Sequence, residues 1–375
     1  MILRIAHFIY DSPYNPWVGG GGSIRNYEIY KRFPESFKID LFSGSYPEAK
    51  NKKIKNNFNQ IFLGKKTKSY ILSRIFYVLS SIGYLKENAS NYDIVIEDFS
   101  PFSNLFSWKF VEDSKLICQI QNFFTVKDFI SKLGFFGIFL FFFQKRSLKE
   151  FKNFIFSSSD LKDKITDSVK LNIRRSVIIS YGIENLLLKR NLIKKKQQIL
   201  FLGRFEIYQK GLDRLIKIWK ILSKEFPDLY LVFAGSGKDE KKLKNLTSKL
   251  SNIKYAGRVK GLKKAKIFGE SLITVMPSRF ESFGIVSIES QACGTPVVAS
   301  DISGLRQTLI HGKTGFLCKT DEDFIYSIKK LIRDKVFYKK MSNSAFIFAK
   351  KYSWDNLAKE QLNFYKSFLR KKNEI

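Results

Sequence analysis

The sequence predicts an α/β protein with two doubly wound parallel-sheet domains. In both halves of the chain, short runs rich in β-branched and aromatic residues alternate with longer amphipathic runs, as expected for parallel strands joined by crossover helices. A chain of 375 residues exceeds one ordinary hydrophobic core and suits two domains. A hydrophobic content of 44% supplies enough apolar surface for both, so the composition excludes a disordered protein.

The first half begins with a strand. The segment 1–13 is apolar for only a few residues and has no basic stretch before a long apolar run, so it predicts a strand rather than a signal peptide. Strands are expected at 3–10, 38–42, 61–63, 92–97, 115–120, 154–157 and 177–179. Helices are expected between them, for example at 23–32, 68–85 and 147–151.

The second half repeats the alternation from the stretch QQILFLGRF onward. Further strands are expected at 229–234, 253–256, 273–276 and 295–299, and helices at 211–225, 238–250, 261–270, 284–292 and 321–333. The lysine-rich, polar segment 186–198 suits an exposed hinge. The predicted organisation is a domain at 1–185, a hinge at 186–198, a domain at 199–350 and a C-terminal helix within 351–375.

One apolar run, GFFGIFLFFF at 134–143, has no polar face and is followed by the cations Lys145, Arg146 and Lys149. It is too short to cross about 30 Å of hydrocarbon as a helix. Two interpretations remain open. The run, Phe135 to Phe143 above all, is a helix buried in the first domain, or it is an interfacial segment whose phenylalanines enter the headgroup region while the cations meet lipid phosphates.

The net charge of +32 implies a positive potential that attracts anions. Because the excess is spread along the chain, it fits either a lysine-rich compositional habit or an attraction to an anionic substrate or bilayer. Three distant cysteines and two histidines fit neither a disulfide framework nor a zinc site, which favours a reducing, cytoplasmic location.

Functional residues are expected after strands, because ligands of open α/β sheets bind beyond the carboxyl ends of the strands. Gly19, Gly20, Gly21 and Gly22 lie directly before a helix expected near Ser23. Glycines there allow close backbone approach and positive φ, and a helix N-terminus offers free N–H groups to a phosphate. The spacing matches neither the nucleotide-binding Gly-x-Gly-x-x-Gly pattern nor a P-loop, so this signal is weak alone.

Two cations follow the strand that opens the second half. Arg204 ends the stretch ILFLGR, and Lys210 with Gly211 stands at the entry to a helix. The planar guanidinium fork and the compact ammonium can together neutralise a leaving diphosphate.

Two carboxylates follow a later strand in the stretch SRFESFGIVSIES. Glu281 lies in a short loop, Gly284 opens a helix, and Glu289 lies in the second turn of that helix. The two carboxylates therefore lie at different depths of one site, with helix-terminal amides between them. An extended ligand with hydroxyls at both ends and anionic groups between them fits this layout, and a sugar nucleotide is such a ligand.

Glu281 to Glu289 resembles the Glu-x7-Glu motif of retaining glycosyltransferases of family 4. Neighbouring motifs agree with the resemblance. They are LGRF with KG at 202–211, VFAGSG at 232–237, AGRV at 256–259, GTPVV at 294–298, HGKTGFL at 311–317 and SYGIE at 180–184. The similarity covers essentially the whole second domain, and the glycine segment and the YSW stretch at 352–354 extend it.

The resemblance implies a GT-B fold with an active site in the cleft between two Rossmann-like lobes, and a last helix that crosses back to the first lobe. It also implies roles for named residues. Glu281 and the amides of Phe283, Gly284 and Ile285 would hold the donor sugar, Arg204 and Lys210 the diphosphate, and Glu289 the ribose. Arg258 and Val259 would hold the base, and Gly235 lies in a donor-binding motif.

The family resemblance also implies retention of anomeric configuration, with the leaving phosphate as base and neither glutamate as nucleophile. No metal and no cofactor are expected, because protein cations replace the metal. The only Asp-x-Asp pattern, at 321–323, is interpreted as the charged first turn of a helix. In one departure, Gln121 and Asn122 stand where family members commonly have a histidine that contacts the donor sugar, and neither titrates near neutral pH.

The expected partners are a nucleotide sugar and a lipid-linked or other glycan acceptor, with possible peripheral contact to an anionic membrane at its cytosolic face. Gly19–Gly22, the apolar run at 135–143, Gln121 and Asn122 are the candidate acceptor contacts. Two alternatives stay open. One is a GT-B sugar-nucleotide epimerase, and the other is a nucleic-acid-binding protein, which dispersed lysines and absent binding motifs disfavour.

Overall fold

The computed structural model describes residues 2–17, 20–188, 193–281 and 283–370 of the chain. Two compact units are present. The first contains residues 1–181 and 355–375, and the second contains Gly182–Trp354. Part of the predicted hinge, 189–192, and Gly19 of the predicted glycine segment lie outside the described residues.

The first unit contains an eight-stranded sheet of order β3-β4-β2-β1-β5-β6-β7-β8. Its strands are β1 Leu3–Phe8, β2 Phe37–Gly44, β3 Lys52–Lys55, β4 Phe58–Leu63, β5 Ile94–Asp98, β6 Leu116–Ile120, β7 Asn153–Phe156 and β8 Arg175–Ile178. Its helices are α1 Gly21–Tyr30, α2 Tyr70–Asn88, α3 Val126–Leu133, α4 Phe136–Lys149, α5 Ser159–Val169 and α13 Trp354–Arg370. All strand pairs are parallel except β3–β4 at one edge.

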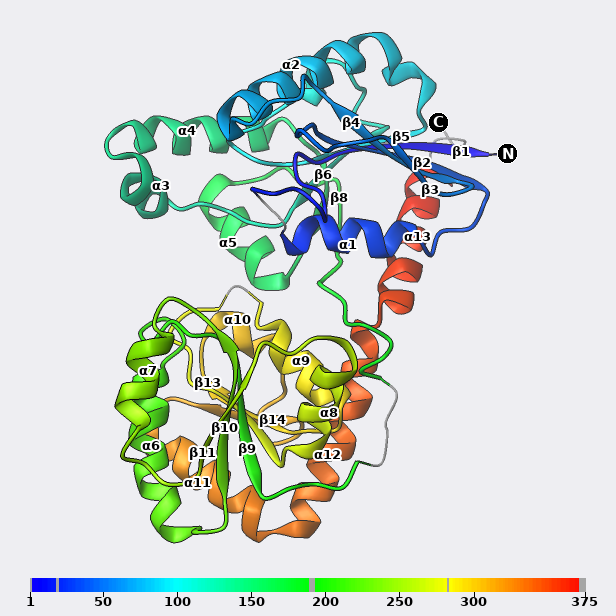
Figure 1. Ribbon diagram of the computed structural model, residues 1–375. Helices are drawn as coiled ribbons and strands as arrows, with labels where there is room; N and C mark the ends of the chain where they lie inside the picture. The colour runs from blue at the N-terminus through cyan, green and yellow to red at the C-terminus, as the bar shows by residue number, and fades with distance from the viewer. Residues whose placement is uncertain (1, 18–19, 189–192, 282, 371–375) are drawn as a thin grey trace. The chain divides into compact units, whose positions relative to one another are not determined.

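Helices cover both faces of this sheet, and Figure 1 shows α1 and α2 on opposite faces. Side chains of α2, α4 and α5 pack with Phe8, Phe42 and Phe156 in one buried cluster. On the other face α13 packs against α1, where the hydroxyls of Tyr30 and Tyr365 lie 3.1 Å apart. The sheet is thus buried on both sides, as its nearly continuous apolar strands require.

The second unit contains a six-stranded parallel sheet of order β11-β10-β9-β12-β13-β14. Its strands are β9 Gln198–Arg204, β10 Tyr230–Ser236, β11 Ile253–Gly257, β12 Ile273–Met276, β13 Val297–Ser300 and β14 Gly315–Cys318. Its helices are α6 Leu212–Glu225, α7 Glu240–Thr247, α8 Gly261–Glu270, α9 Ile285–Ala292, α10 Ser303–Arg306, α11 Asp321–Arg333 and α12 Lys335–Ala349. The main core of this unit surrounds the fully buried Trp219.

The predicted class of two doubly wound sheets is confirmed. The prediction missed several elements, because their sequences lack the expected pattern. Strand β3 carries three lysines in four residues and pairs only at an edge, and β14 lies within a glycine-rich motif.

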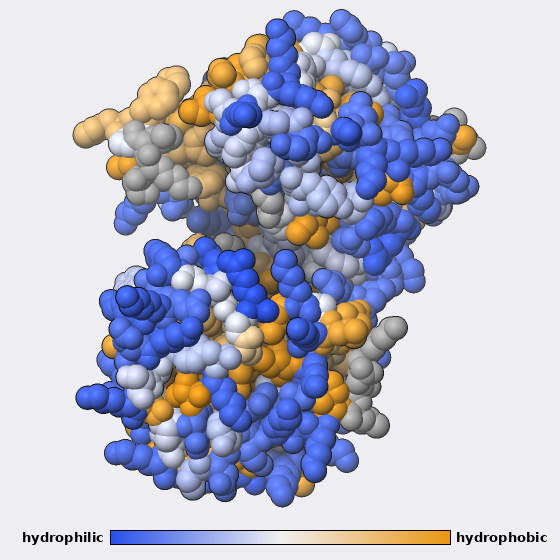
Figure 2. Space-filling model, viewed as in Figure 1, coloured by the Kyte–Doolittle hydropathy of each residue, from blue (hydrophilic) through white to orange (hydrophobic). Residues whose placement is uncertain are grey.

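The apolar run is not a buried helix, so that interpretation is wrong. It forms most of α4, and four of its phenylalanines are exposed, namely Phe135 (91%), Phe136 (63%), Phe139 (65%) and Phe142 (62%). The buried face of α4 instead contains Gly137, Gln144, Ser147 and Leu148. Figure 2 shows a hydrophobic patch over this part of the surface.

In the described part of the chain, no helix combines the length and hydropathy needed to cross a membrane. The predicted helix at 147–151 is the end of α4 rather than a separate element.

Candidate active site

The first unit has a cavity of about 410 Å³ beyond the carboxyl ends of β1, β5 and β6. The strand order of the sheet reverses direction between β1 and β5, and ligands of doubly wound sheets bind at this kind of switch point. The cavity brings together Gly20, Gly21, Gly22, Gln121 and Asn122, which the sequence analysis proposed as acceptor contacts. Their role in binding remains a prediction.

The glycine segment meets the cavity through the start of α1, which begins at Gly21 rather than near Ser23. Of the two features that glycine allows, the described glycines do not use positive φ, since Gly20 is extended with φ −92° and the next two lie in the helix. Glycine is needed here because neighbouring side chains lie too close for a Cβ. A Cβ on Gly22 would lie 2.2 Å from Oε1 of Gln121, and one on Gly21 would lie 3.2 Å from the Tyr181 ring.

Asp11, which follows β1, holds the glycine segment in place. Its Oδ2 accepts a hydrogen bond from the backbone N–H of Gly20 at 2.8 Å, and its Oδ1 accepts one from the N–H of Ser12 at 2.8 Å. Burial raises the pKa of Asp11 to about 6, against the opposing effect of these backbone hydrogen bonds. The carboxylate therefore ionises within the range of ordinary assay conditions.

Gln121 has both ends of its side-chain amide occupied. Its Nε2 donates to Oδ2 of Asp98 at 2.5 Å, and its Oε1 accepts from the Tyr181 hydroxyl at 3.2 Å. The amide orientation is thus fixed by its neighbours. Asn122, the next residue, is exposed and lines the cavity.

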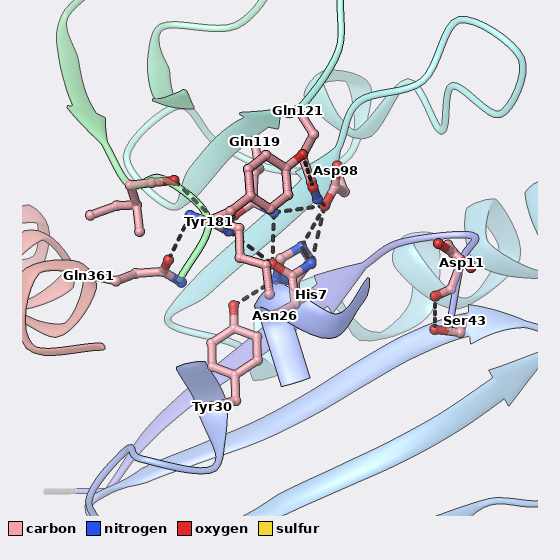
Figure 3. A network of polar contacts seen from close by, with 12 residues as sticks. His7, Asp11, Asn26, Tyr30, Ser43, Asp98, Gln119, Gln121, Tyr181 and Gln361 are labelled. Carbon is pink, nitrogen blue, oxygen red and sulfur yellow. Dashed lines mark hydrogen bonds and ion pairs between the residues drawn. The ribbon is translucent and has the colours of Figure 1, made fainter. Parts of the chain in front are cut away.

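Asp98 is the centre of a buried polar network, shown in Figure 3. Besides Gln121, its Oδ2 accepts from Asn26 at 3.1 Å and from Gln119 at 2.7 Å, and His7 Nε2 lies 3.7 Å away. Burial lowers the pKa of His7, which outweighs the opposing effect of Asp98. His7 is therefore a neutral, packed residue.

Arg25 anchors the same network from α1. Its side chain is fully buried and donates to Oε1 of Gln119 at 2.7 Å, to backbone oxygens of Ile179 and Ser180, and to Gln361 on α13 at 3.2 Å. The network therefore joins α1, the ends of β5 and β6, and α13 around one cavity wall.

The second unit has its own switch point between β9 and β12. Lys210 follows β9 and Glu281 follows β12, and Lys210 Nζ lies 2.6 Å from Glu281 Oε1. Both side chains are mostly buried, and Ser278 Oγ donates to the same carboxylate oxygen at 3.0 Å. Two predicted residues, 71 positions apart in sequence, thus form one ion pair.

Gly211 makes this approach possible. Its φ is +63°, and a Cβ there would lie 1.9 Å from the carbonyl oxygen of Pro277 at the end of β12. No residue with a side chain fits that position. The β9–α6 connection therefore packs directly on the β12 end and brings Lys210 to Glu281.

A second ion pair, which the sequence analysis missed, supports the same junction. Arg279 makes a bidentate pair with Asp213, at 2.7 Å for each hydrogen bond, and donates to the Tyr208 carbonyl at 2.8 Å. Hydrogen bonding from Arg279 lowers the pKa of Asp213. Neither residue stood out in sequence, because an Asp near a helix start and an Arg in a loop are common.

Glu289 lies on α9, which begins after Gly284 as predicted. The carboxylate is 9% exposed, pairs through Oε1 with Lys264 of α8, and has an Oε2 that is buried without a hydrogen-bond partner among the described residues. Burial raises its pKa. A buried acceptor without a donor is the group that a ligand hydroxyl can satisfy.

The other predicted donor contacts have varied surroundings. Phe283 is buried with its ring 6.1 Å from that of Tyr352, and Gly284, at φ +66°, is the N-cap of α9 that precedes Ile285. Gly235 meets the neighbouring strand, because a Cβ there would lie 1.9 Å from the Gly203 oxygen.

Arg258 and Val259 follow β11. Arg258 is exposed and donates to Ser236, and Val259 is half-buried against the Leu200 cluster. Neither contact places a nucleobase there, so the role of this pair in binding remains a prediction.

Arg204 is not joined to the Lys210–Glu281 pair. Its side chain is 65% exposed and lies 3.0 Å from Glu206 instead. A second cavity, of about 350 Å³, is lined by His311, Asp323 and neighbouring residues and includes none of the predicted donor contacts.

Asp321–Asp323 forms the first turn of α11, as expected. Thr320 and Asp323 make a capping box, and Asp321 pairs with Arg214 at 2.8 Å. Within the described ranges, no three His, Cys, Asp or Glu side chains are grouped as metal ligands would be. Metal independence remains a prediction.

Comparison with known proteins finds similarity mainly in this second unit. Residues 183–347 match the family model described as glycosyl transferases group 1. An uncharacterized glycosyltransferase of Methanocaldococcus jannaschii is 34% identical over 204 residues, which are 52% of this chain and 48% of that protein. A phosphatidyl-myo-inositol mannosyltransferase of Mycobacterium leprae is 28% identical over 172 residues, 45% of this chain and 46% of that protein. The chain thus spans about half the length of these curated relatives.

Solved structures match over nearly the whole chain. Sucrose-phosphate synthase from Thermosynechococcus elongatus has a TM-score of 0.73 at 17% identity, covering 98% of this chain and 99% of that one. HepE of Anabaena, solved in complex with UDP-glucose, has a TM-score of 0.66 at 15% identity, covering 97% and 100%. The chain has the GT-B fold, and its segment 183–347 matches the model of the glycosyl transferases group 1, in agreement with the resemblance seen in the sequence.

Proposed function

We propose that the chain transfers a hexosyl group from a nucleotide-diphosphate sugar to a hydroxyl acceptor, with retention of anomeric configuration and without a metal or cofactor. The observation that carries the proposal is the Lys210–Glu281 pair at the switch point of the second sheet. A cation and a carboxylate at one site suit a substrate that has a diphosphate next to sugar hydroxyls. The family match covers the same segment.

Different residues of the second unit bind different parts of the donor. Lys210, assisted by Arg204, stabilises negative charge that develops on the departing diphosphate, and Glu281 holds the donor sugar. Glu289, whose Oε2 has no hydrogen-bond partner among the described residues, accepts a hydrogen bond from the ribose. The amides of Phe283, Gly284 and Ile285 support the sugar, and Arg258 with Val259 contacts the base.

The acceptor binds in the cavity of the first unit. Gln121, Asn122 and the N–H groups at the start of α1 supply polar contacts for hydroxyls there. The hydroxyl that attacks passes its proton to the departing phosphate, so neither glutamate acts as a nucleophile.

Assay with radiolabelled sugar donors tests this function. The protein is incubated with UDP-, GDP- and ADP-hexoses and a membrane lipid extract, and label is followed into lipid and glycan. We expect transfer from one donor class, with an unchanged anomeric configuration in the product by NMR. An isomerised nucleotide sugar without transfer would indicate an epimerase and would contradict the proposal.

We further propose that the acceptor is a lipid-linked or other cell-envelope glycan precursor and that α4 docks on an anionic membrane at its cytosolic face. The exposed phenylalanines of α4 form one stripe, and the basic residues Lys145, Arg146 and Lys149 follow in the same helix. Apolar side chains next to cations suit the boundary of a bilayer that contains anionic lipids.

Vesicle sedimentation tests this docking. Replacing Phe135, Phe139 and Phe142 together by Ser should release the protein from vesicles with anionic lipids. Val336→Ser, at an 82% exposed position in the second unit, is the matched control and should leave binding unchanged. Equal sedimentation of both variants with the wild type would refute the membrane contact.

A further inference from the structure

Arg74 of α2 lines the cavity of the first unit, and its hydrogen bonds go to neutral hydroxyls. Its NH1 donates to the Tyr70 hydroxyl at 2.7 Å, and its NH2 donates to Ser100 Oγ at 3.2 Å and to Ser103 Oγ at 3.1 Å. None of the ion pairs found among the described residues includes Arg74. A partly buried guanidinium without a carboxylate lacks the partner that such a charge normally has.

Three aromatic rings fix the guanidinium in place. Its Cζ lies 5.1 Å from the ring centroid of Tyr10, 5.5 Å from that of Tyr70 and 5.4 Å from that of Phe102. All three aromatic residues line the same cavity. Cation–π contacts offset part of the cost of desolvating the charge, but they do not occupy the N–H donors of the guanidinium.

Donor capacity remains on this side chain. A guanidinium has five N–H donors, and the three hydrogen bonds to hydroxyls use three of them. Its Nε is buried and has no hydrogen-bond partner in the described structure. The cavity wall therefore holds a fixed cation with spare donors.

The two carboxylates of the cavity are engaged elsewhere. Asp98 accepts hydrogen bonds from Asn26, Gln119 and Gln121, and Asp11 accepts from two backbone N–H groups. The cavity thus has a carboxylate and amide region that suits hydroxyls and a cationic, aromatic region that suits an acid attached to an apolar group.

We propose that the cavity selects an acceptor that carries a phosphate or carboxylate, that Arg74 binds this acidic group, and that Tyr10, Tyr70 and Phe102 contact the apolar part next to it. This inference rests on the function proposed above, in which the same cavity holds the acceptor. It adds the chemical class of the acceptor and the residue that determines it.

Binding of three probes that share one hydrocarbon chain tests the inference. Geranyl phosphate, geranic acid and geraniol are titrated into the full chain by calorimetry. We expect the acids to bind more tightly than the alcohol, and whichever acid binds better identifies the anionic group. Arg74→Gln should weaken acid binding by about tenfold or more, since hydrogen bonds to charged groups contribute about 1.5–3 kcal/mol. Geraniol binding should be unchanged.

Controls separate this site from the donor site. Lys86→Gln removes an exposed cation of the same helix and should leave all three affinities unchanged. Lys210→Met should also leave acid binding unchanged, because the second unit is not involved. Arg74→Lys keeps the charge and should fall between the wild type and Arg74→Gln.

Equal wild-type affinity for the acids and the alcohol would overturn the inference, even if Arg74→Gln failed to fold. An equal loss in Arg74→Gln and Lys86→Gln would also overturn it. Sugar transfer from a nucleotide donor without any preference for acids would leave the proposed function standing and refute the role of Arg74. A clear preference for acids without any sugar transfer would support the role of Arg74 and refute the proposed function.

Discussion

Ionisation of Asp11, which holds the glycine segment, makes the stability of the protein depend on pH. Its pKa is 3.8 in an unperturbed chain and about 6 in the folded protein, because burial opposes the charged form. Between these values the folded state keeps a proton that the unfolded state has lost, so raising the pH through this window lowers the free energy of unfolding. Asp11→Asn removes this contribution.

The expected result is a smaller loss of stability from about pH 4 to about pH 6.5 in Asp11→Asn than in the wild type, measured by urea unfolding. Asp163→Asn, at an exposed position of α5, is the control and should follow the wild type. Parallel curves for the wild type and Asp11→Asn would show that this carboxyl titrates normally.

The absence of a side chain at Gly22 leaves room for the side chain of Gln121. An added Cβ would lie 2.2 Å from the Gln121 side chain, which is long enough to move away but would lose its bonds to Asp98 and Tyr181. We expect Gly22→Ala to reduce transfer to the acceptor while nucleotide binding is unchanged, as measured by transfer assay and calorimetry.

Gly83→Ala is the matched control, because Gly83 also lies in a helix but nothing lies within 4 Å of an added Cβ. It should gain up to about 1 kcal/mol of stability from helix propensity, with unchanged transfer. Unchanged transfer in Gly22→Ala as well would show that Gln121 has no part in acceptor binding.

Sequence reasoning found the residues of the site that belong to motifs and missed their partners. Glu281 and Lys210 were identified because each follows a predicted strand and lies shortly before a glycine at the start of a helix. Lys264 and Arg74 were missed because they lie within helices among many other cations. Only packing distinguishes a lysine that pairs with a buried carboxylate from a solvated one.

The β9–α6 connection depends on Gly211. The residue combines φ +63° with a position where any Cβ would overlap the Pro277 oxygen. Gly211→Ala should therefore cost more than the about 1–2 kcal/mol of a left-handed backbone alone, and should displace Lys210 from Glu281.

Gly257→Ala isolates the backbone effect. Gly257 has φ +64° and nothing within 4 Å of an added Cβ, so this variant should show only the backbone cost. Urea unfolding of both variants gives the comparison. If the two substitutions cost the same, the contact between Gly211 and Pro277 does not constrain the connection.

Helix α4 shows why its orientation could not be predicted from sequence. A helix with apolar residues all round predicts burial, yet α4 buries Gly137, Gln144 and Ser147 and exposes phenylalanines. Gly137 packs against the backbone of Phe129, where a Cβ would lie 2.4 Å from its oxygen. The small residue, not the apolar ones, determines which face meets the protein.

Both units of the molecule share one strand order around their first strand, and each has its candidate site where that order reverses. This level of organisation was predictable, because alternating strand and helix patterns allow few right-handed topologies. The antiparallel edge strand β3 could not be predicted, because its lysine-rich sequence lacks the apolar pattern of a strand. Its pairing depends on the neighbouring β4.

The most direct test of the proposed function is the kcat/KM for the nucleotide-sugar donor in Lys210→Met, compared with Lys217→Met at an exposed position of α6. Lys210 is expected to stabilise charge on the leaving diphosphate, so its loss should lower kcat/KM by roughly 10²–10³-fold, while Lys217→Met matches the wild type. Wild-type kcat/KM in Lys210→Met would contradict the assignment of this ion pair to the donor site.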